Sequence, residues 1–165
     1  MKKFEKIQKL LKMTFEAEKR YYHAAQEVQI VPLTRFLNYQ SSKRNKFANE
    51  IAEALTFNDI KPVMSYIDKA KSKLLGLDIK RSLENTKYIP IMTKCLDFDQ
   101  DIIDTSALLL KDRSLPVDIA EVLTRQMTFL IFQWIEGTDI IEELNSDRQV
   151  NHKKTKIITL KNYIM

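Results

Sequence analysis

The chain has 165 residues with only two glycines and four prolines, so it has little turn material and suits one domain of long helices. Its net charge of +5 comes from residues 148–165, which hold five of the 27 Lys and Arg and no Asp or Glu; the other 22 balance the 22 acidic residues. A neutral body with a basic end argues against a dedicated nucleic-acid-binding domain, because such domains carry positive charge on the binding surface.

Prolines and apolar periodicity predict the positions of the helices. Each proline falls where a helix would begin, a place that tolerates the missing N–H; these are Pro32, Pro62, Pro90 and Pro116. Apolar residues at steps of three and four predict long helices over residues 3–29, 32–57, 89–111 and 116–144. A short helix is expected over 62–75, ended by Gly76. The chain from about residue 146 is expected to be an extended segment or a loose end.

The links between the helices predict their arrangement. The short links at 30–31 and 112–115 force antiparallel pairs, whereas residues 58–88 can travel the height of a bundle. We therefore predict an all-α fold, a four-helix bundle over residues 1–146 with a long crossover connection that contains a short extra helix. A basic C-terminal tail, residues 147–165, would follow it.

A charged residue interrupts the apolar stripe of the first predicted helix, because Glu18 stands in its middle. Counting ten residues from the same end of each helix places Glu18 level with Lys43 and Asp99. Each of the four helices interrupts its apolar stripe at this level. The sequence thus predicts a buried or half-buried polar layer, and its candidate members are Glu18, Lys43, Arg44, Asp99 and Gln126.

Four segments carry a resemblance to a known family: AEKRYYHAAQEV, SSKRNKFANEIAEAL, KCLDFDQDIIDTSALLL and LPVDIAEVLTRQM. Together they resemble the small bacterial ferritin-like proteins of the stress-associated YciF type, over about residues 4–144. The connector VMSYIDKAKSKLLGLDIK also resembles that family's extra helix. The resemblance implies a ferritin-like bundle. In active members of the superfamily, two helices each supply one Glu to a pair of metal ions, and the other two each supply a Glu-x-x-His pair.

The metal ligands that this resemblance implies are largely missing. Glu18 matches the lone carboxylate of the first helix, and Asp99, or alternatively Asp101, matches that of the third. Lys43 or Arg44 stands where the family has an acidic ligand, and no Glu-x-x-His occurs in the sequence. We expect no cofactor and an ion pair in place of the metal. Two alternatives stay open: the carboxylates reach water at the edge of the seam, or Glu18 and Asp99 bind a metal.

The last predicted helix has more apolar surface than one core contact needs. Phe129, Phe132 and Trp134 cover several faces of it, so the connector, the tail or another subunit should cover a second side. We expect a homodimer. The tail, residues 148–165, is expected to be solvated, with weak anion or membrane-surface contact as the alternative.

The remaining features concern location and role. Cys95 has no partner for an internal disulfide, and the start, MKKFEKIQKLLKM, alternates charged and apolar residues too often for a secretory signal. The best apolar run, MTFLIFQWI, is too short to span a membrane. We therefore expect a soluble cytoplasmic protein. Its expected role is structural or interaction-based and non-catalytic, with a link to stress that the resemblance alone implies. The rival is a di-iron or di-manganese oxidase or a metal-storage protein.

Overall fold

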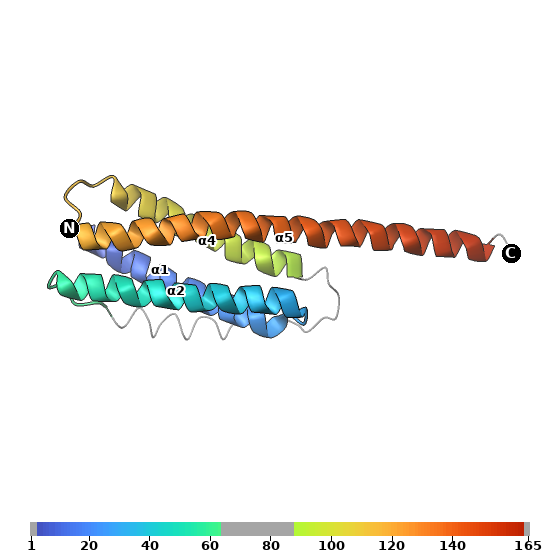
Figure 1. Ribbon diagram of the computed structural model, residues 1–165, viewed down its shortest axis with the longest axis horizontal. Coiled ribbons are helices and arrows are strands. Elements are labelled where there is room, and N and C mark those ends of the chain that lie inside the picture. Colours follow the sequence, from blue (N-terminus) through green and yellow to red (C-terminus); the bar gives the residue numbers. More distant parts are fainter. Residues whose placement is uncertain (1–2, 64–87, 164–165) are drawn as a thin grey trace.

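The computed structural model describes residues 3–63 and 88–163, and these residues form four helices (Figure 1). They are α1 (Lys3–Glu27), α2 (Val31–Phe57), α4 (Tyr88–Leu110) and α5 (Val117–Tyr163), and the described part of the chain has no strand. The predicted all-α four-helix bundle is thus confirmed. Pro62 and Val63 are not helical, and the rest of the short helix predicted over 62–75 lies outside the described residues.

The predicted starts of the long helices agree with the structure to within one residue. Pro32 lies in the first turn of α2, where the backbone N–H of Thr34 reaches the carbonyl of Ile30 at 2.9 Å. The carbonyl of Pro116 accepts the first helical hydrogen bond of α5, from Ala120 at 2.9 Å. Proline suits these positions because the first N–H groups of a helix have no partner within it.

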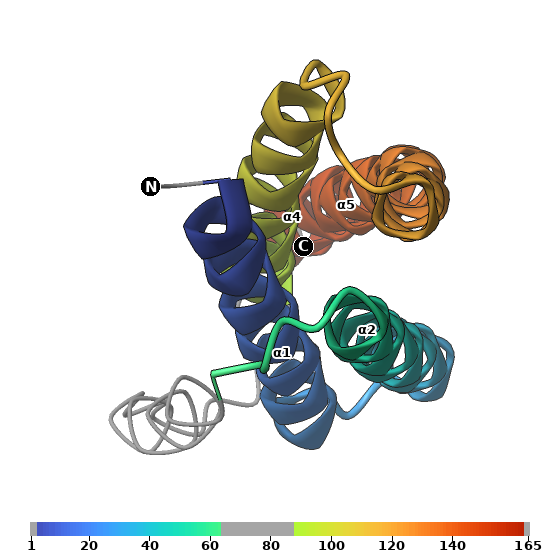
Figure 2. The ribbon, with the colours of Figure 1, turned by 90° about the vertical axis from the view of Figure 1, so that its left-hand side faces the viewer.

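The helices form a four-sided bundle (Figure 2). α1 packs beside α2 and α4, and α5 packs beside α4 and α2, so α2 and α4 lie diagonally across the core. α1 and α2 are antiparallel, as are α4 and α5 (Figure 1). Because α2 ends and α4 begins at opposite ends of the bundle, the chain between Phe57 and Tyr88 has to cover its length. This arrangement confirms the predicted long crossover.

The core consists of two apolar clusters. One contains Ile7, Leu11, Ile51, Leu55, Ile102, Ile119 and Leu123 among others. The other, nearer the start of α2, contains Tyr21, Val28, Leu33, Leu37, Tyr88, Met92 and Cys95 among others. Buried polar residues of α2 and α4, among them Gln40, Arg44 and Asp99, lie between the two clusters along the chain.

Helix α5 corrects one prediction. It continues without interruption to Tyr163 and projects beyond the other helices (Figure 1), whereas the chain past residue 146 was expected to be extended or loose. Between Asn145 and Tyr163 there is no Gly or Pro to end the helix. The boundary predicted between residues 146 and 147 therefore does not coincide with the end of a helix.

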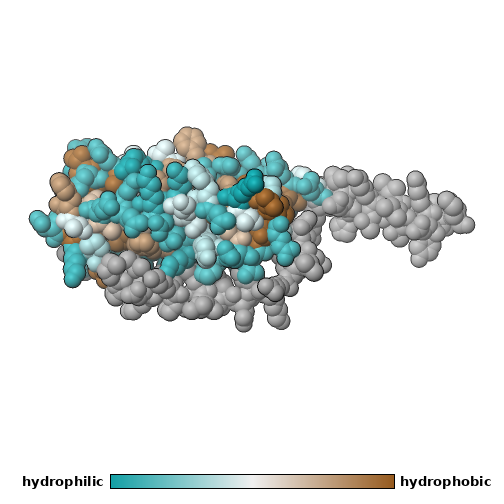
Figure 3. Space-filling model, turned by 60° about the horizontal axis from the view of Figure 1, so that its bottom comes forward, coloured by the Kyte–Doolittle hydropathy of each residue, from teal (hydrophilic) through white to brown (hydrophobic). Residues whose placement is uncertain are grey.

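The surface of the bundle is mixed in character. On the face shown in Figure 3, hydrophilic residues cover most of the described surface and hydrophobic residues form separate areas. No helix in the described part of the chain has a stretch that is both long enough and apolar enough to cross a membrane.

Candidate functional site

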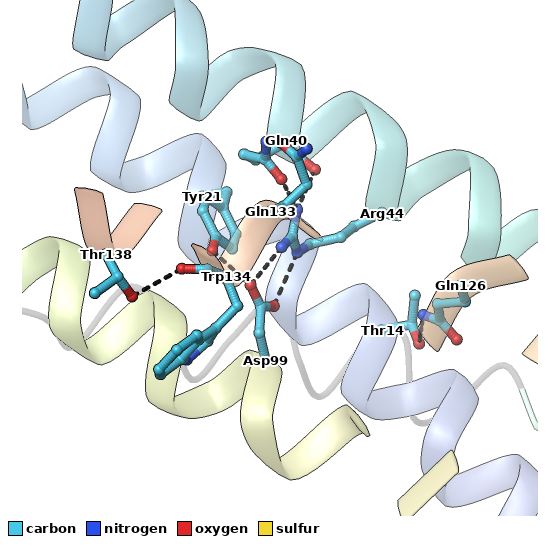
Figure 4. Close-up of polar contacts among 9 residues, drawn as sticks. All are labelled: Thr14, Tyr21, Gln40, Arg44, Asp99, Gln126, Gln133, Trp134 and Thr138. Carbon is cyan, nitrogen blue, oxygen red and sulfur yellow. Dashed lines mark hydrogen bonds and ion pairs between the residues drawn. The ribbon is translucent and has the colours of Figure 1, made fainter. Parts of the chain in front are cut away.

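A buried ion pair joins Arg44 of α2 to Asp99 of α4 across the diagonal of the bundle (Figure 4). Arg44 Nε donates to Asp99 Oδ1 at 3.0 Å, and Arg44 Nη2 donates to Asp99 Oδ2. Both side chains have an exposed fraction of 0%. Two parallel N–H to oxygen bonds match the planar guanidinium to the carboxylate and fix their relative orientation. The pair therefore links two helices that lie on opposite sides of the core.

Other polar side chains extend this ion pair to all four helices. Tyr21 of α1 donates from its hydroxyl to Asp99 Oδ2 at 2.6 Å. Arg44 Nη1 donates to both the backbone carbonyl and the side-chain oxygen of Gln40, each at 2.8 Å. Gln40 Nε2 in turn donates to Oε1 of Gln133 on α5. We call these five residues, Tyr21, Gln40, Arg44, Asp99 and Gln133, the Arg44 network.

The Arg44 network satisfies the charges that it buries. Arg44 donates four hydrogen bonds within it, and Asp99 accepts three. The guanidinium also lies over the ring of Tyr21, with its Cζ atom 3.8 Å from the ring centroid. A buried charge is costly unless it is paired and its hydrogen-bonding groups are used. Here both conditions are met, so the network can persist inside an apolar core.

Burial and charge together set the protonation states of the network and its neighbour Cys95. Burial raises the pKa of Tyr21 well above its usual value, although the nearby Arg44 acts in the opposite direction. Burial alone would lower the pKa of Arg44, but Asp99 and Tyr21 keep it above the usual value. Burial, with a contribution from Asp99, raises the pKa of Cys95 to about 12. Near neutral pH, Arg44 is therefore charged, Tyr21 keeps the proton that it donates, and Cys95 is a thiol.

Three of the predicted polar residues are buried, but they make two separate contacts. Arg44 and Asp99 meet as predicted. Gln126 of α5 is also buried, yet its Nε2 donates to Thr14 Oγ1 of α1 at 2.8 Å, away from the ion pair (Figure 4). The side-chain oxygen of Gln126 has no hydrogen-bond partner among the residues described. The predicted single layer is therefore a network around Arg44 and a second contact between α1 and α5.

Glu18 is partly exposed rather than central. The inward positions of α1 at this height are Ala17 and Tyr21, each with an exposed fraction of 1%. The predicted stripe stepped from Thr14 to Glu18, whereas the step of three to Ala17 is the one that faces the core. A helical turn of 3.6 residues allows either step, so an error of one residue rotates the side chain by about 100°.

Lys43 also differs from its predicted place. Its side chain is partly exposed, and its ammonium lies 5.3 Å from the centroid of the Tyr39 ring, which is on the exposed side of α2. Consecutive residues of a helix point in directions about 100° apart, and here Arg44 points into the core while Lys43 points toward its edge. The structure selects Arg44.

Sequence reasoning did not assign Tyr21 and Gln40 to the ion pair. Two signals were present: Tyr21 lies seven residues after the buried Thr14, and Gln40 lies four residues before Arg44, so each shares a helix face with a buried residue. The prediction had Glu18 as the residue of α1 beside the cation, whereas the structure has Tyr21, which contacts both Arg44 and Asp99.

The donor set does not fit the pair of metal ions that the ferritin-like resemblance implies. No group of three or more His, Cys, Asp or Glu side chains among the residues that the structure describes is arranged to hold a metal ion. The carboxylate of Asp99 is already bound on both oxygens by Arg44, whose positive charge would repel a metal cation. Hard metal ions require several oxygen ligands, and one neutralised carboxylate does not provide them.

Comparison with known proteins does not assign a family: no family model, no curated protein and no solved structure matches the chain. The resemblance to ferritin-like proteins therefore stays a prediction, and the function has to be argued from the residues described above.

Proposed function

We propose that this protein is a non-catalytic structural or interaction protein, built on a ferritin-like bundle in which an ion pair replaces a metal centre. The observation that supports this proposal is the buried pair of Arg44 and Asp99. Ferritin-like metal proteins place their ligands on facing helices in the centre of the bundle. In the centre of this bundle a guanidinium neutralises Asp99, the one buried carboxylate among the residues that the structure describes.

The protonation states of the network also support a non-catalytic role. An acid-base group works best when its pKa lies near the working pH, and a nucleophilic cysteine reacts as the thiolate. The pKa of Tyr21 is raised well above its usual value of 10.0, and that of Cys95 is raised to about 12. Both side chains are also buried, with exposed fractions of 1% and 4%. Tyr21 and Cys95 therefore fit a role as core residues better than a role as acid-base or nucleophilic groups.

A rigid bundle without a catalytic site acts by binding other molecules through its surface. The Arg44 network fixes the relative positions of all four helices, and a polar contact inside an apolar core favours one packing over others. We infer that the surface of α5 is the part that other chains contact, and that the partner is a second copy of the protein. The family resemblance alone adds a connection with stress to this proposal.

Metal analysis tests this function directly. The protein, purified without chelators, should contain iron, manganese and zinc well below one ion per chain, and added Mn²⁺ or Fe²⁺ should not raise its thermal unfolding midpoint, because a ligand that binds the folded state stabilises it. About two ions per chain would overturn the proposal and favour an oxidase or a metal-storage protein. Asp99→Asn is the matched control, since metal held in the core would decrease in this variant and metal on the surface would not.

A further inference from the structure

Two consecutive segments of α5 carry opposite charges. The acidic segment, residues 136–147, contains five acidic residues and no Lys or Arg; they are Glu136, Asp139, Glu142, Glu143 and Asp147. All five are exposed. The basic segment, residues 148–163, contains five basic residues and no Asp or Glu; they are Arg148, Lys153, Lys154, Lys156 and Lys161. One helix therefore carries a charge of −5 followed directly by +5.

The basic segment continues beyond the bundle (Figure 1). Ile140, Ile141 and Leu144 of α5 still pack against a core cluster, but the helix runs on to Tyr163. A helix of about 16 residues is marginal in water when nothing packs against it. This one also contains five β-branched residues, which favour a helix only weakly: Val150, Thr155, Ile157, Ile158 and Thr159. A projecting helix of this composition needs a partner along its length.

An exposed apolar patch lies on α5 just before the acidic segment. It consists of Ile131, Phe132, Trp134 and Ile135, whose exposed fractions are between 38% and 65%. Their neighbour Leu130 is fully buried, so the patch lies on the side of α5 away from the core. Adjacent large apolar side chains on a surface indicate a contact with another molecule.

We propose that two copies of the chain form a dimer by antiparallel pairing of their α5 helices. The acidic segment of each copy lies beside the basic segment of the other, and the apolar end of each basic segment reaches the partner's apolar patch. With residues 147 and 148 at the twofold axis, Glu142 faces Lys153, and Asp139 faces Lys156. In the same register Ile135 faces Leu160. Opposite charges and apolar residues are thus matched by one alignment.

The positions that this alignment uses lie on one side of the helix. Ile135, Asp139, Glu142, Lys153, Lys156 and Leu160 follow one another at steps of four, three, eleven, three and four residues, and eleven residues make about three whole helical turns. Such steps form a continuous stripe, the pattern by which helices pair along their length. Ile135 and Glu142 are exposed, so the stripe is on the outward side of the bundle.

Geometry also favours the antiparallel arrangement. A parallel pair would place acidic segment against acidic segment, which repels. In the antiparallel pair, each basic segment lies along the other copy's bundle, and the two bundles lie at opposite ends of the paired helices without overlap. An anionic membrane or a nucleic acid would attract the basic segment but repel the acidic one, and it would leave the apolar patch uncovered. A second copy of the chain provides a partner for the acidic segment, the basic segment and the apolar patch.

Charge reversal in the full-length protein tests this pairing. Analytical ultracentrifugation should show a dimer whose dissociation constant rises with salt. The variants Lys153→Glu/Lys156→Glu and Asp139→Lys/Glu142→Lys should each raise that constant roughly tenfold or more, because every change occurs twice in a symmetric dimer. The variant that combines all four changes should dimerise again, and so should an equimolar mixture of the two double variants. Lys94→Glu/Lys111→Glu makes the same change of charge at exposed sites elsewhere and should stay dimeric.

The inference deepens the proposed role as an interaction protein, and its test is independent of metal content. A monomeric wild-type chain at high concentration would overturn it. A dimer that neither double variant weakens would overturn it as well. If both double variants are monomeric and helical by circular dichroism, yet neither the combined variant nor the mixture recovers, the segments do not pair. A monomer that binds anionic vesicles or nucleic acid at about 0.15 M salt would assign the basic segment to that partner instead.

Discussion

Tyr21 and Asp99 share a hydrogen bond of 2.6 Å in the centre of the bundle, and the Asp99 oxygen that accepts it also accepts from Arg44. The ring of Tyr21 lies at the same time against the face of the guanidinium, 3.8 Å from Cζ. One side chain of α1 therefore contacts both members of an ion pair formed by α2 and α4. Removal of any of the three groups changes the surroundings of the other two.

Tyr21→Phe removes the hydroxyl and keeps the ring. Asp99 then loses one of its hydrogen bonds while both of its bonds to Arg44 remain. We expect a loss of about 1 to 3 kcal/mol in the free energy of unfolding, measured by urea denaturation, because a charged acceptor is left partly unsatisfied. Tyr22→Phe is the matched control, since that side chain is 51% exposed, and it should change the free energy by less than about 0.5 kcal/mol. Equal effects of the two changes would contradict the role given to the Tyr21 hydroxyl.

Arg44→Met should be the most damaging change in the network. It leaves the carboxylate of Asp99 buried without its countercharge, so we expect unfolding to become easier by about 3 kcal/mol or more. Lys43→Met removes the same charge one residue earlier from a partly exposed side chain and should cost less than about 0.5 kcal/mol. Denaturant unfolding of the two variants under the same conditions measures the difference.

The double variant Arg44→Met/Asp99→Leu shows whether Asp99 is the reason for that loss. It removes both charges, and apolar side chains of similar size often replace a buried ion pair at little cost. It should therefore be more stable than Arg44→Met alone. Asp99→Leu alone completes the comparison. If the loss of the double variant equals the losses of Arg44→Met and Asp99→Leu added together, the two residues act independently, which would contradict the ion pair.

The sequence predicted the bundle, and it placed Lys43, Arg44 and Asp99 at about one height, for a clear reason. Proline positions and apolar periodicity are local signals, and link lengths restrict four helices to few arrangements. Counting along helices then placed Asp99 near residues 43 and 44. This count carries an uncertainty of about one residue, which is enough to exchange Arg44 for Lys43 on α2 and Ala17 for Glu18 on α1. Rotation of a side chain into a core depends on packing against other helices, which periodicity alone does not give.

The continuation of α5 was missed for a different reason. Val150, Thr155 and residues 157–159 are β-branched and have low helix propensity, so residues 148–163 do not resemble a helix when their propensities are considered. In the proposed dimer, the basic residues of 148–163 acquire a role only beside the acidic residues of 136–147 in a second copy. Signals that depend on a partner chain are not visible when a segment is read alone.

Gly137 is another residue whose role depends on packing. It is buried in α5, and a Cβ atom at this position would lie 2.7 Å from Cδ2 of Leu96 on α4. Gly137→Leu should therefore lower the free energy of unfolding by about 1 to 3 kcal/mol, because extra volume in a packed core forces its neighbours to move. Glu136→Leu introduces the same side chain at the exposed neighbouring position and should cost less than about 0.5 kcal/mol. If Gly137→Leu is as stable as this control, α4 and α5 do not approach closely at this point.

Alkaline pH should destabilise the bundle in part through Cys95. Burial raises the pKa of this thiol from 9.0 to about 12, so the unfolded chain loses the proton at lower pH than the folded chain. The sign follows from this difference: the contribution to stability is complete below about pH 9 and is lost as pH rises from about 9 to about 12. In this window the thiol alone can reduce the free energy of unfolding by at most about 1.4 kcal/mol per pH unit. Urea denaturation at a series of pH values should therefore show a shallower alkaline slope for Cys95→Ala than for the wild-type chain. Identical slopes would mean that the thiol ionises equally easily in the folded and unfolded states, and that it is not buried beside Asp99.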